Sequence, residues 1–460
     1  MLSLVSVCNG VQYYKAHIAV PVGAGQSGLN VGARFRQMNI PTLIIHRDDA
    51  VGDGWRKRYP SLTLHTPNTH HSCGWIDTVT ENINSRIVTT VLYTRFPTNA
   101  PKFTPRDKVV SMLEQYAQNQ DLIIWNRSTV IPTPSYNPLT KRWTVNILRD
   151  GAMVTLYPHH IVLAIGLGKP YFPLLPGMEK FKGVALHANN FKAGSSFSGK
   201  NTIVIGASQT AADTCQQLAI CGAASITMVQ RSSTIVVSMD YTMGKLKAFW
   251  PMHTDPSIGD FKLAGMPLGL LKQIEIGEKE NRVAQQKEML DGLLKAGLNI
   301  DEGSEGGGQI TAIYERSGGK SYLLIPKSLT IIFLLRILYD SQLLFKSGIL
   351  LTFALGIDIG TADLIIKGRV KIKSGTQPDH FVSDGVVFKD GSSLKADLVV
   401  FATGYEPVKD NVRGIFGEEL ATKVTPIWNM DEEGECRRTY TPSGQPGVSL
   451  AMCAPMTTSY

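Results

Sequence analysis

The sequence is poor in the cysteine patterns that mark redox and zinc sites. It has six cysteines in 460 residues, and no two of them form a C-x-x-C pair. This argues against a redox-active dithiol and against a zinc ribbon. Three histidines, His65, His70 and His71, lie close together, but no carboxylate or cysteine pattern accompanies them. We therefore predict no metal site.

Acidic residues are outnumbered as well. Lysine and arginine total 46 against 38 aspartates and glutamates, which gives a formal net charge of +8. The basic residues are scattered, and the densest cluster, residues 56–58, has no aromatic ladder beside it. Nucleic-acid binding is therefore disfavoured, whereas a cationic surface suits phosphorylated cofactors.

A long uncharged apolar run is also missing. The most apolar stretch, residues 323–357, is interrupted by Lys327, Arg336, Asp340 and Lys346. It contains no window of the roughly 18 uncharged residues that a membrane-spanning helix needs. No charged segment precedes the apolar start of the chain, so we predict no signal peptide. We expect no membrane span and a cytoplasmic location, and the pattern leaves the oligomeric state open.

Two glycine-rich turns occur in the same local context. Residues 23–28 follow an apolar strand at 17–22 and precede a helix and a second apolar run at 42–45. Residues 206–211 follow a strand at 202–205 and precede a helix and a strand at 226–229. In such strand–turn–helix–strand units a pyrophosphate meets the helix N-terminus. We predict an α/β fold with two three-layered, Rossmann-like dinucleotide-binding domains, one for FAD and one for the nicotinamide that reduces it.

Three glycines of the first turn have separate physical tasks. Gly23 allows a tight turn, Gly25 lets the backbone approach a phosphate, and Gly28 allows close packing of helix on strand. We assign all three to FAD. The following strand ends at His46, where an acidic residue usually binds the ribose hydroxyls. Asp48, or its neighbour Asp49, is our candidate for that contact.

The second turn offers Gly206, Ser208 and Ala211 to the other nucleotide. The strand that follows it ends at Arg231, which lies 25 residues after Gly206, close to the offset of about 20 at which the ribose is usually recognised. An acidic residue there favours NAD, whereas arginine fits a 2′-phosphate. We therefore predict NADPH. The alternative is that Arg231 is an ordinary solvated strand end.

The rest of the pattern is typical of a turn-dense α/β enzyme. Apolar spacing predicts a helix through 109–116 and strands at 143–147 and 161–164. Residues 51–56 are predicted as a loop and residues 192–200 as a linker. Residues 283–294 are predicted as a helix, with the charged run at 278–282 before it as a solvated face. Residues 396–405 predict a strand that ends in a small-residue turn.

Four motifs together carry a family resemblance. They are the turns at 23–28 and 206–211, the run Phe401-Ala402-Thr403-Gly404-Tyr405, and Phe181-x-Gly183-x-x-x-His187-x-x-x-Phe191 between the turns. With them the chain resembles class B flavin-containing monooxygenases, most closely fungal members and the plant indole-3-pyruvate monooxygenases. Lys192 directly after the middle motif favours this branch over the Baeyer–Villiger relatives.

The resemblance implies an FAD-dependent monooxygenase that consumes NADPH and O₂ and acts on a small organic substrate through a C4a-hydroperoxyflavin. It places His187 at the junction of the two domains and His65 near a polar position beside the flavin, and we take both as candidate catalytic residues. It adds Trp55, Arg56 and Thr403 to the candidate cofactor contacts. We expect an FAD domain in two segments, 17–199 and 356–460, with an NADPH domain at 200–355 between them.

Several features depart from the family. Pro21 lies inside the first strand, where proline removes a hydrogen-bond donor. Two segments, approximately 73–91 and 320–355, do not continue the surrounding pattern, and retained introns would account for both. The chain stops at Tyr460, where relatives continue into a last helix. These features leave two other hypotheses open: a catalytically impaired or mispredicted product that binds cofactors poorly, and a simple NAD(P)H:acceptor flavin reductase.

Overall fold

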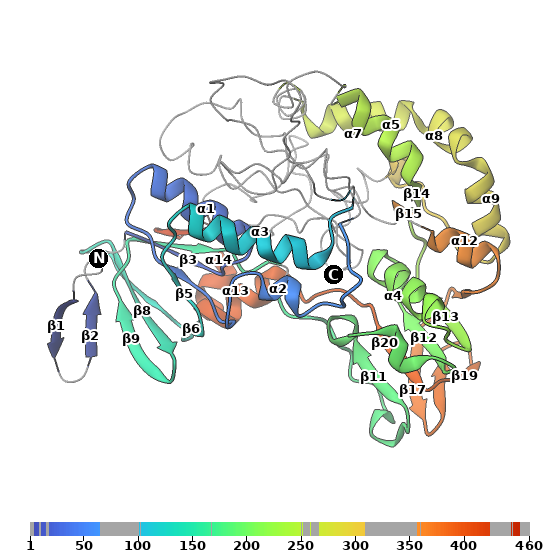
Figure 1. The fold of residues 1–460 in the computed structure, drawn as a ribbon, viewed down its shortest axis with the longest axis horizontal. Coiled ribbons are helices and arrows are strands. Elements are labelled where there is room, and N and C mark those ends of the chain that lie inside the picture. The colour runs from blue at the N-terminus through green and yellow to red at the C-terminus, as the bar shows by residue number, and fades with distance from the viewer. Residues whose placement is uncertain are drawn as a thin grey trace.

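The computed structural model describes residues 4–8, 11–14, 18–64, 101, 103–166, 168–249, 251, 258, 266–308, 357–358, 360–423, 443 and 445–450. His65 and its two neighbouring histidines lie outside these ranges, as do the segments 73–91 and 320–355 and the end of the chain. Most of the described residues belong to two α/β units, the first at the left of Figure 1 and the second at its lower right. Within these ranges no helix is both long enough and apolar enough to cross a membrane.

The first unit is built on a parallel sheet in the order β21-β10-β3-β4-β5. Its strands are β3 (Ala19–Val22), β4 (Ile44–Ile45), β5 (Ile124–Trp125), β10 (His160–Leu163) and β21 (Val448–Leu450). Its helices are α1 (Gln26–Gln37), α2 (Asp53–Arg56), α3 (Arg106–Asn119), α13 (Val408–Phe416) and α14 (Glu418–Lys423).

Both faces of this sheet are covered, which explains its nearly continuous apolar strands. On one face Ala19 packs with Val31 of α1. On the other, Val20 packs with residues of α13 and α14 and with an antiparallel sheet in which β8 lies between β6 and β7 and also pairs with β9. The strands of that sheet are β6 (Ser128–Val130), β7 (Ser135–Asn137), β8 (Arg142–Arg149) and β9 (Ala152–Leu156). The strands predicted at 143–147 and 161–164 and the helix predicted through 109–116 are thus confirmed, whereas the loop predicted at 51–56 contains α2.

Pro21 is accommodated inside β3 at the cost of one ladder position. The N–H groups of Ala19 and Gly23, two residues away on either side, donate to Pro41 O (3.3 Å) and Ile45 O (2.7 Å). In a strand every second N–H points toward the same neighbouring strand, so residue 21 would donate to that neighbour between the bonds of Ala19 and Gly23. Pro21 has no N–H, and this one hydrogen bond is missing. The flanking bonds keep the strand in register, and β10 pairs with β3 along all four of its residues.

The second unit repeats the architecture with a parallel sheet in the order β11-β20-β12-β13-β16. Its strands are β11 (Val184–His187), β12 (Asn201–Ile205), β13 (Ser225–Gln230), β16 (Lys371–Ser374) and β20 (Leu398–Phe401). Helices α4 (Gln209–Ile220) and α12 (Thr361–Ile366) accompany it, and an antiparallel sheet of β17 (Pro378–Val382), β18 (Gly385–Phe388) and β19 (Ser393–Lys395) packs against its other side. The predicted class, α/β with two Rossmann-like units, is confirmed.

Strand pairing crosses the predicted domain boundaries. β11 precedes position 200, and β16 and β20 follow position 355, yet all three belong to the second sheet. The chain therefore leaves the first unit after β10 and returns to it after β20. We propose that the second unit extends from β11 to β20, rather than over 200–355. The linker predicted at 192–200, which contains the 3₁₀ turn η4 (Gly194–Phe197), then lies inside it.

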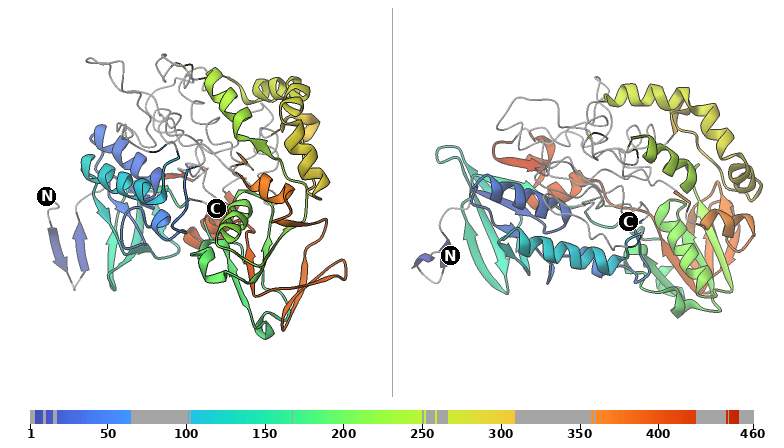
Figure 2. Two further views of the ribbon diagram at one scale, coloured as in Figure 1. Left: turned by 45° about the vertical axis from the view of Figure 1, so that its right-hand side comes forward. Right: turned by 45° about the horizontal axis from the view of Figure 1, so that its top comes forward.

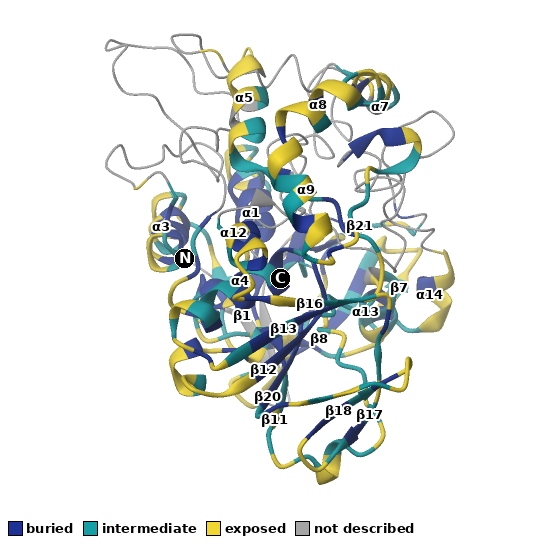
Figure 3. Cartoon of the chain, turned by 90° about the vertical axis from the view of Figure 1, so that its right-hand side faces the viewer, coloured by how far each residue is buried: buried dark blue, intermediate teal, exposed yellow. Residues whose placement is uncertain are grey.

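Further helices run along the outer side of the second unit, in yellow-green and yellow in Figures 1 and 2. They are α5 (Met239–Phe249), α7 (Leu268–Gly277), α8 (Lys279–Gln285) and α9 (Lys287–Lys295). The short strand β14 (Val237–Ser238) directly precedes α5 and pairs in parallel with β15 (Ile357–Asp358), which follows α9 in the chain. The remaining elements are a hairpin, β1 (Leu4–Cys8) and β2 (Val11–Tyr14), and the 3₁₀ turns η2 (Met178–Lys180), η3 (Ala188–Asn190) and η5 (Ser304–Gly306). Figure 3 shows exposed residues on α5, α7, α8 and α9 and buried residues along the strands of the second sheet.

One prediction about these helices is wrong. The charged run 278–282 is not a fully solvated face, because Arg282 is only 7% exposed. Its guanidinium donates to Glu275 O (2.9 Å) and Gly306 O (2.5 Å) and lies 3.4 Å from the Glu275 carboxylate, which Lys245 also contacts. The predicted helix at 283–294 is also divided, since α8 ends at Gln285 and α9 begins at Lys287.

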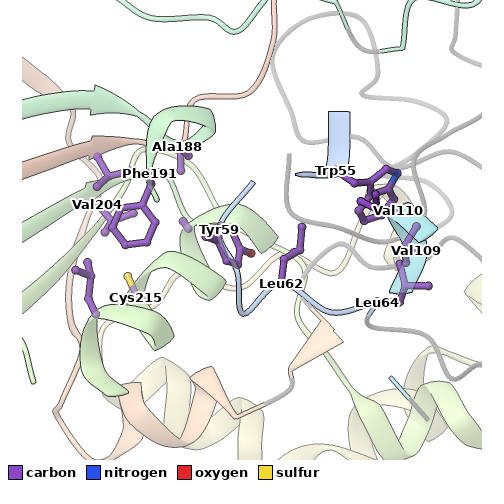
Figure 4. Packing of buried hydrophobic residues seen from close by; sticks show 14 of the residues in the cluster. Trp55, Tyr59, Leu62, Leu64, Val109, Val110, Ala188, Phe191, Val204 and Cys215 are labelled. Carbon is purple, nitrogen blue, oxygen red and sulfur yellow. The ribbon is translucent and has the colours of Figure 1, made fainter. Parts of the chain in front are cut away.

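One apolar cluster joins the two units. It contains Trp55, Leu62 and residues of α3 from the first unit, and Phe191, Cys215 and other residues of the second. Figure 4 shows Tyr59 between these two groups, with Phe191 and Cys215 on one side and Leu62, Leu64 and Trp55 on the other. The junction is therefore a packed core, which fixes how the two nucleotide-binding folds sit relative to each other.

Candidate functional site

The first turn has the steric features expected of a pyrophosphate site. Gly23 has φ +111°, and a Cβ on it would lie 2.3 Å from Ala164 O. A Cβ on Gly28 would lie 1.7 Å from Gly23 O. A Cβ on Gly25 would meet nothing within 4 Å. Two of the glycines are thus required by the protein's own packing, whereas Gly25 borders open space into which a ligand can approach the backbone.

The second turn has the same backbone arrangement. Gly206 has φ +129°, and a Cβ on it would lie 2.5 Å from Ala402 O. Its N–H donates to Val229 O on the next strand (2.9 Å), as the N–H of Gly23 donates to Ile45 O (2.7 Å). Ala211, at the position equivalent to Gly28, is fully buried in the apolar cluster. The two turns are therefore structural equivalents, with alanine packing where the first turn needs glycine.

Both helices that follow the turns begin without a side-chain cap. The N-cap residue of α1 is Gly25, which has no side chain, and that of α4 is Ser208, whose side chain makes no capping hydrogen bond. Neither helix has an acidic residue in its first turn. The backbone N–H groups at a helix start and the positive end of the helix dipole favour an anion at such a terminus. Both turns fit the diphosphate of a dinucleotide.

His46 directly follows β4, at the position where an acidic residue usually binds the ribose. The Ala24 N–H donates to its Nδ1 (3.2 Å), so Nε2 carries the proton and donates to Ala50 O (3.2 Å). Burial lowers the pKa of His46, although Asp48, 3.9 Å away, acts in the opposite direction. A neutral imidazole thus ties the first turn to the loop after β4, and both its nitrogens are used within the protein.

Asp48 lies beside this imidazole. Burial acts to raise the pKa of its carboxyl, but the hydrogen bond from Lys57 (2.6 Å) and nearby positive charge outweigh burial and lower it. The group is an ionised carboxylate at the sheet edge, and ribose binding by it stays a prediction.

The other two first-unit candidates are used mainly in packing and ion pairing. The Trp55 side chain is buried beside Val110 of α3 (Figure 4). The Arg56 guanidinium is paired with Asp53 and with Glu114 of α3. These contacts hold α2 against α3, and an FAD contact for either residue stays a prediction.

Arg231 lies directly after β13 and is exposed. The preceding residue, Gln230, is fully buried and is held by Thr234 and Asn299. The buried Gln230 therefore fixes the place where the chain leaves the sheet, and the next residue, Arg231, lies at the surface. This position suits a 2′-phosphate, and the contact stays a prediction.

His187 is a buried structural bridge. Its Nδ1 accepts the Asn189 N–H (3.1 Å), so Nε2 carries the proton and donates to Gly404 O (3.1 Å). Burial is the main cause that lowers its pKa to about 4, and Arg58 lowers it further. The neutral ring packs edge-on against Tyr405, whose hydroxyl donates to Asn189 Oδ1 (2.8 Å). The middle motif thus holds the turn at 403–405.

That turn belongs to the crossing between the two units. The Thr403 hydroxyl donates to Tyr171 O, and the Tyr171 N–H donates to Gly404 O (2.9 Å). The Glu406 N–H donates to Lys169 O (2.8 Å), and the two side chains form an ion pair at 3.1 Å. The outgoing and returning segments therefore run antiparallel and bonded to each other, and His187 fastens β11 to this crossing.

The structure thus gathers the candidates into three groups: the first turn with Asp48, the second turn with Arg231, and His187 with Thr403 at the crossing. Sequence reasoning missed three buried polar residues near them. His46 was noted only as a missing acid, and Tyr59 and Asp213, which bond to each other, carried no signal. Nothing in a single sequence pairs residues that lie 154 positions apart.

Comparisons with known proteins agree with this fold. A family model described as pyridine nucleotide-disulphide oxidoreductase matches residues 20–248. The indole-3-pyruvate monooxygenase YUCCA1 of Oryza sativa subsp. japonica is 25% identical over 389 residues, covering 84% of this chain and 76% of the rice protein. The probable indole-3-pyruvate monooxygenase YUCCA4 of Arabidopsis thaliana is 24% identical, covering 84% of this chain and 74% of the relative.

A solved structure, the flavin-containing monooxygenase from Stenotrophomonas maltophilia, aligns with a TM-score of 0.55 at 17% identity over 95% of this chain and 92% of that one. Fold and turns together define a protein of the two-dinucleotide oxidoreductase class. Within that class the chain is similar to flavin monooxygenases, in agreement with the predicted resemblance.

Proposed function

We propose that this protein is an FAD-dependent monooxygenase that takes electrons from NADPH, consumes O₂ and oxygenates a small organic substrate. The observation that carries the proposal is the equivalence of the two turns. Each has an obligatory first glycine and an uncapped helix, and each meets a carbonyl of its own sheet. One chain with two such turns is suited to two dinucleotides. The names of the plant relatives favour oxygenation as the reaction.

FAD is assigned to the first unit. Gly23, Gly25 and Gly28 would form its diphosphate turn, and Asp48 would accept from its ribose. When bound, the flavin would supply the redox and oxygen chemistry, as cofactors do in such enzymes. The protein's task is to place it: His46 fixes the turn through Ala24, and α2 fixes the neighbouring loop through its contacts with α3.

NADPH is assigned to the second unit. Gly206 and Ser208 would meet its diphosphate, Ala211 packs the helix close to the strand, and Arg231 would pair with the 2′-phosphate. His187 and Thr403 act between the units. Since the His187 imidazole is neutral and both nitrogens are bonded to backbone, its role is to hold the crossing in place rather than to transfer a proton.

A second candidate is a simple NAD(P)H:acceptor flavin reductase. The family model that matches residues 20–248 is described as a disulphide oxidoreductase, which favours a two-electron reductase. The sequence lacks the C-x-x-C pair of a disulfide-reducing member, so the acceptor would be another small molecule. A cytoplasmic location is part of the proposal in either case.

The test is to purify the full chain and to measure flavin content, NADPH oxidation and O₂ uptake with a panel of substrates. Indole-3-pyruvate, named for the plant relatives, is the first compound to try. Substrate-dependent consumption of NADPH and O₂ in equal amounts, with an equal amount of oxygenated product in place of hydrogen peroxide, supports the monooxygenase. NADPH oxidation that follows an added artificial acceptor and forms no oxygenated product supports the reductase. A colourless protein that takes up no added FAD contradicts both.

A further inference from the structure

One buried hydrogen bond crosses from the first unit to the helix of the second turn. The Tyr59 hydroxyl donates to Asp213 Oδ2 at 2.7 Å, and Gln209 Nε2 donates to Asp213 Oδ1 at 3.2 Å. Tyr59 is 3% exposed and Asp213 is 5% exposed. A buried carboxylate is costly unless it is hydrogen-bonded, so its donors are held in fixed positions. This contact specifies one relative placement of the two units more sharply than apolar packing can.

The donor side belongs to the loop that follows the first nucleotide site. Tyr59 comes three residues after α2, whose start at Gly52 (φ +83°) and Asp53 is tied to the loop after His46. Its neighbour Lys57 pairs with Asp48 and, through its carbonyl, accepts from Lys192 of the second unit. Any ligand that orders residues 46–56 therefore acts directly on the position of the Tyr59 hydroxyl.

The acceptor side belongs to the second nucleotide site. Asp213 is one helical turn after Gln209, the first residue of α4, and the two side chains are bonded. Gln209 directly follows Ser208, the N-cap of the second turn. The Tyr59 ring also packs edge-on against Phe191, with ring centroids 6.4 Å apart. Since Phe191 is the last residue of the middle motif, that motif contacts Tyr59 as well. A shift of Tyr59 is thus passed to the first turn of α4.

We propose that Tyr59 and Asp213 couple the two nucleotide sites, so that FAD in the first site fixes Tyr59, and Tyr59 sets the turn that receives NADPH. The inference rests on the proposed function for the identity of the two ligands. Tyr59 is a positioning residue here. By linkage, FAD then raises the affinity for NADP⁺, and NADP⁺ raises the affinity for FAD by the same factor.

The test measures that factor directly. NADP⁺ affinity is determined by calorimetry on the full chain with FAD bound and after FAD has been removed, for the wild type and for Tyr59→Phe. The variant keeps the ring that packs on Phe191 and removes only the hydroxyl. We expect FAD to tighten NADP⁺ binding about tenfold in the wild type, within the usual range of coupling between sites, and less than about twofold in Tyr59→Phe.

Two further variants separate coupling from loss of stability. Asp213→Asn keeps an acceptor for the tyrosine and should retain part of the coupling, and the effects of the two changes should be non-additive in the double variant. Tyr136→Phe removes a hydroxyl from the far side of the first unit, where the ring lies against Trp143, and should leave the factor unchanged. A merely structural contact would lower the melting temperature of Tyr59→Phe and leave the factor intact, which would overturn the inference.

The outcomes also distinguish this inference from the proposed function. If the wild type binds both nucleotides with the coupling described but oxygenates nothing, the coupling stands and the monooxygenase assignment fails. If Tyr59→Phe retains the full factor while oxygenation is observed, the inference fails alone. If the wild type binds neither nucleotide, both fail.

Discussion

His187 gives a prediction whose magnitude follows from its surroundings. The side chain belongs to a residue only 4% exposed, and both ring nitrogens are bonded to backbone groups in the neutral form. Its pKa is about 4 in the folded protein, against 6.5 for the unperturbed side chain. Between these values the unfolded chain binds a proton that the folded chain does not bind. Stability is therefore full above pH 6.5 and is lost as the pH falls toward 4.

The size of the effect follows from linkage. Two-state titration with these two pKa values gives a loss of about 2 kcal/mol between pH 7 and pH 5 from His187 alone. The assay is urea unfolding followed by tryptophan fluorescence at both pH values, with the wild type compared with His187→Gln. The variant is expected to be less stable at pH 7, because it loses the fit of the imidazole between the Asn189 N–H and Gly404 O. Its free energy of unfolding should nevertheless fall by about 2 kcal/mol less than that of the wild type on acidification. Contributions from other histidines, such as His46, cancel in this difference.

His380→Gln is the matched control, since that side chain is exposed at the surface, and it should follow the wild type at both pH values. An equal loss on acidification in the wild type and in His187→Gln would refute the reasoning. It would mean that His187 is already protonated or solvated in the folded protein, and that the crossing at 403–405 is held by other contacts.

Other changes test the nucleotide sites and the outer helices. Gly25→Ala should leave the melting temperature near that of the wild type and reduce bound flavin several-fold, whereas Gly28→Ala should lower the melting temperature sharply, because its Cβ would collide with Gly23 O; the reverse order would contradict the steric argument. Arg231→Ala should raise the KM for NADPH by about tenfold or more and the KM for NADH very little, and equal changes would remove the 2′-phosphate assignment. Arg282→Leu should destabilise the protein by about 3 kcal/mol in urea unfolding, because it leaves buried Glu275 short of a partner, and a loss below about 1 kcal/mol would indicate that Lys245 alone suffices.

The overall class was predictable because its signals are local. Each glycine turn lies between an apolar strand and an amphipathic helix, and Gly23 and Gly206 adopt the positive φ that only glycine accepts easily. The order of strands was less accessible. β20 joins the second sheet because it pairs with β12, and β11 joins it because it pairs with β20. Pairing between strands this far apart in the sequence leaves no periodic pattern that could reveal it.

The candidate site was predictable only in part, for the same reason. The turns and Arg231 follow from spacing along one chain segment. The role of His46, by contrast, depends on a hydrogen bond from the Ala24 N–H, 22 residues earlier in the chain. From the sequence alone, His46 could be noted only as the absence of the expected acidic residue. The charged run at 278–282 was misjudged because burial of Arg282 depends on Gly306 and Glu275, which the chain brings to it from both directions.

The bonded crossing at Pro170 and Tyr405 has a consequence for the modularity of the chain. The two ends of the second unit lie side by side, so this unit is an insertion, here called the cassette. It could be exchanged between related proteins without changing the strand order of the first sheet. The shared apolar cluster acts against free exchange, since a transplanted cassette would have to present its own match to Tyr59, Leu62 and Trp55. Successful chimeras should therefore carry the 55–64 loop together with the cassette.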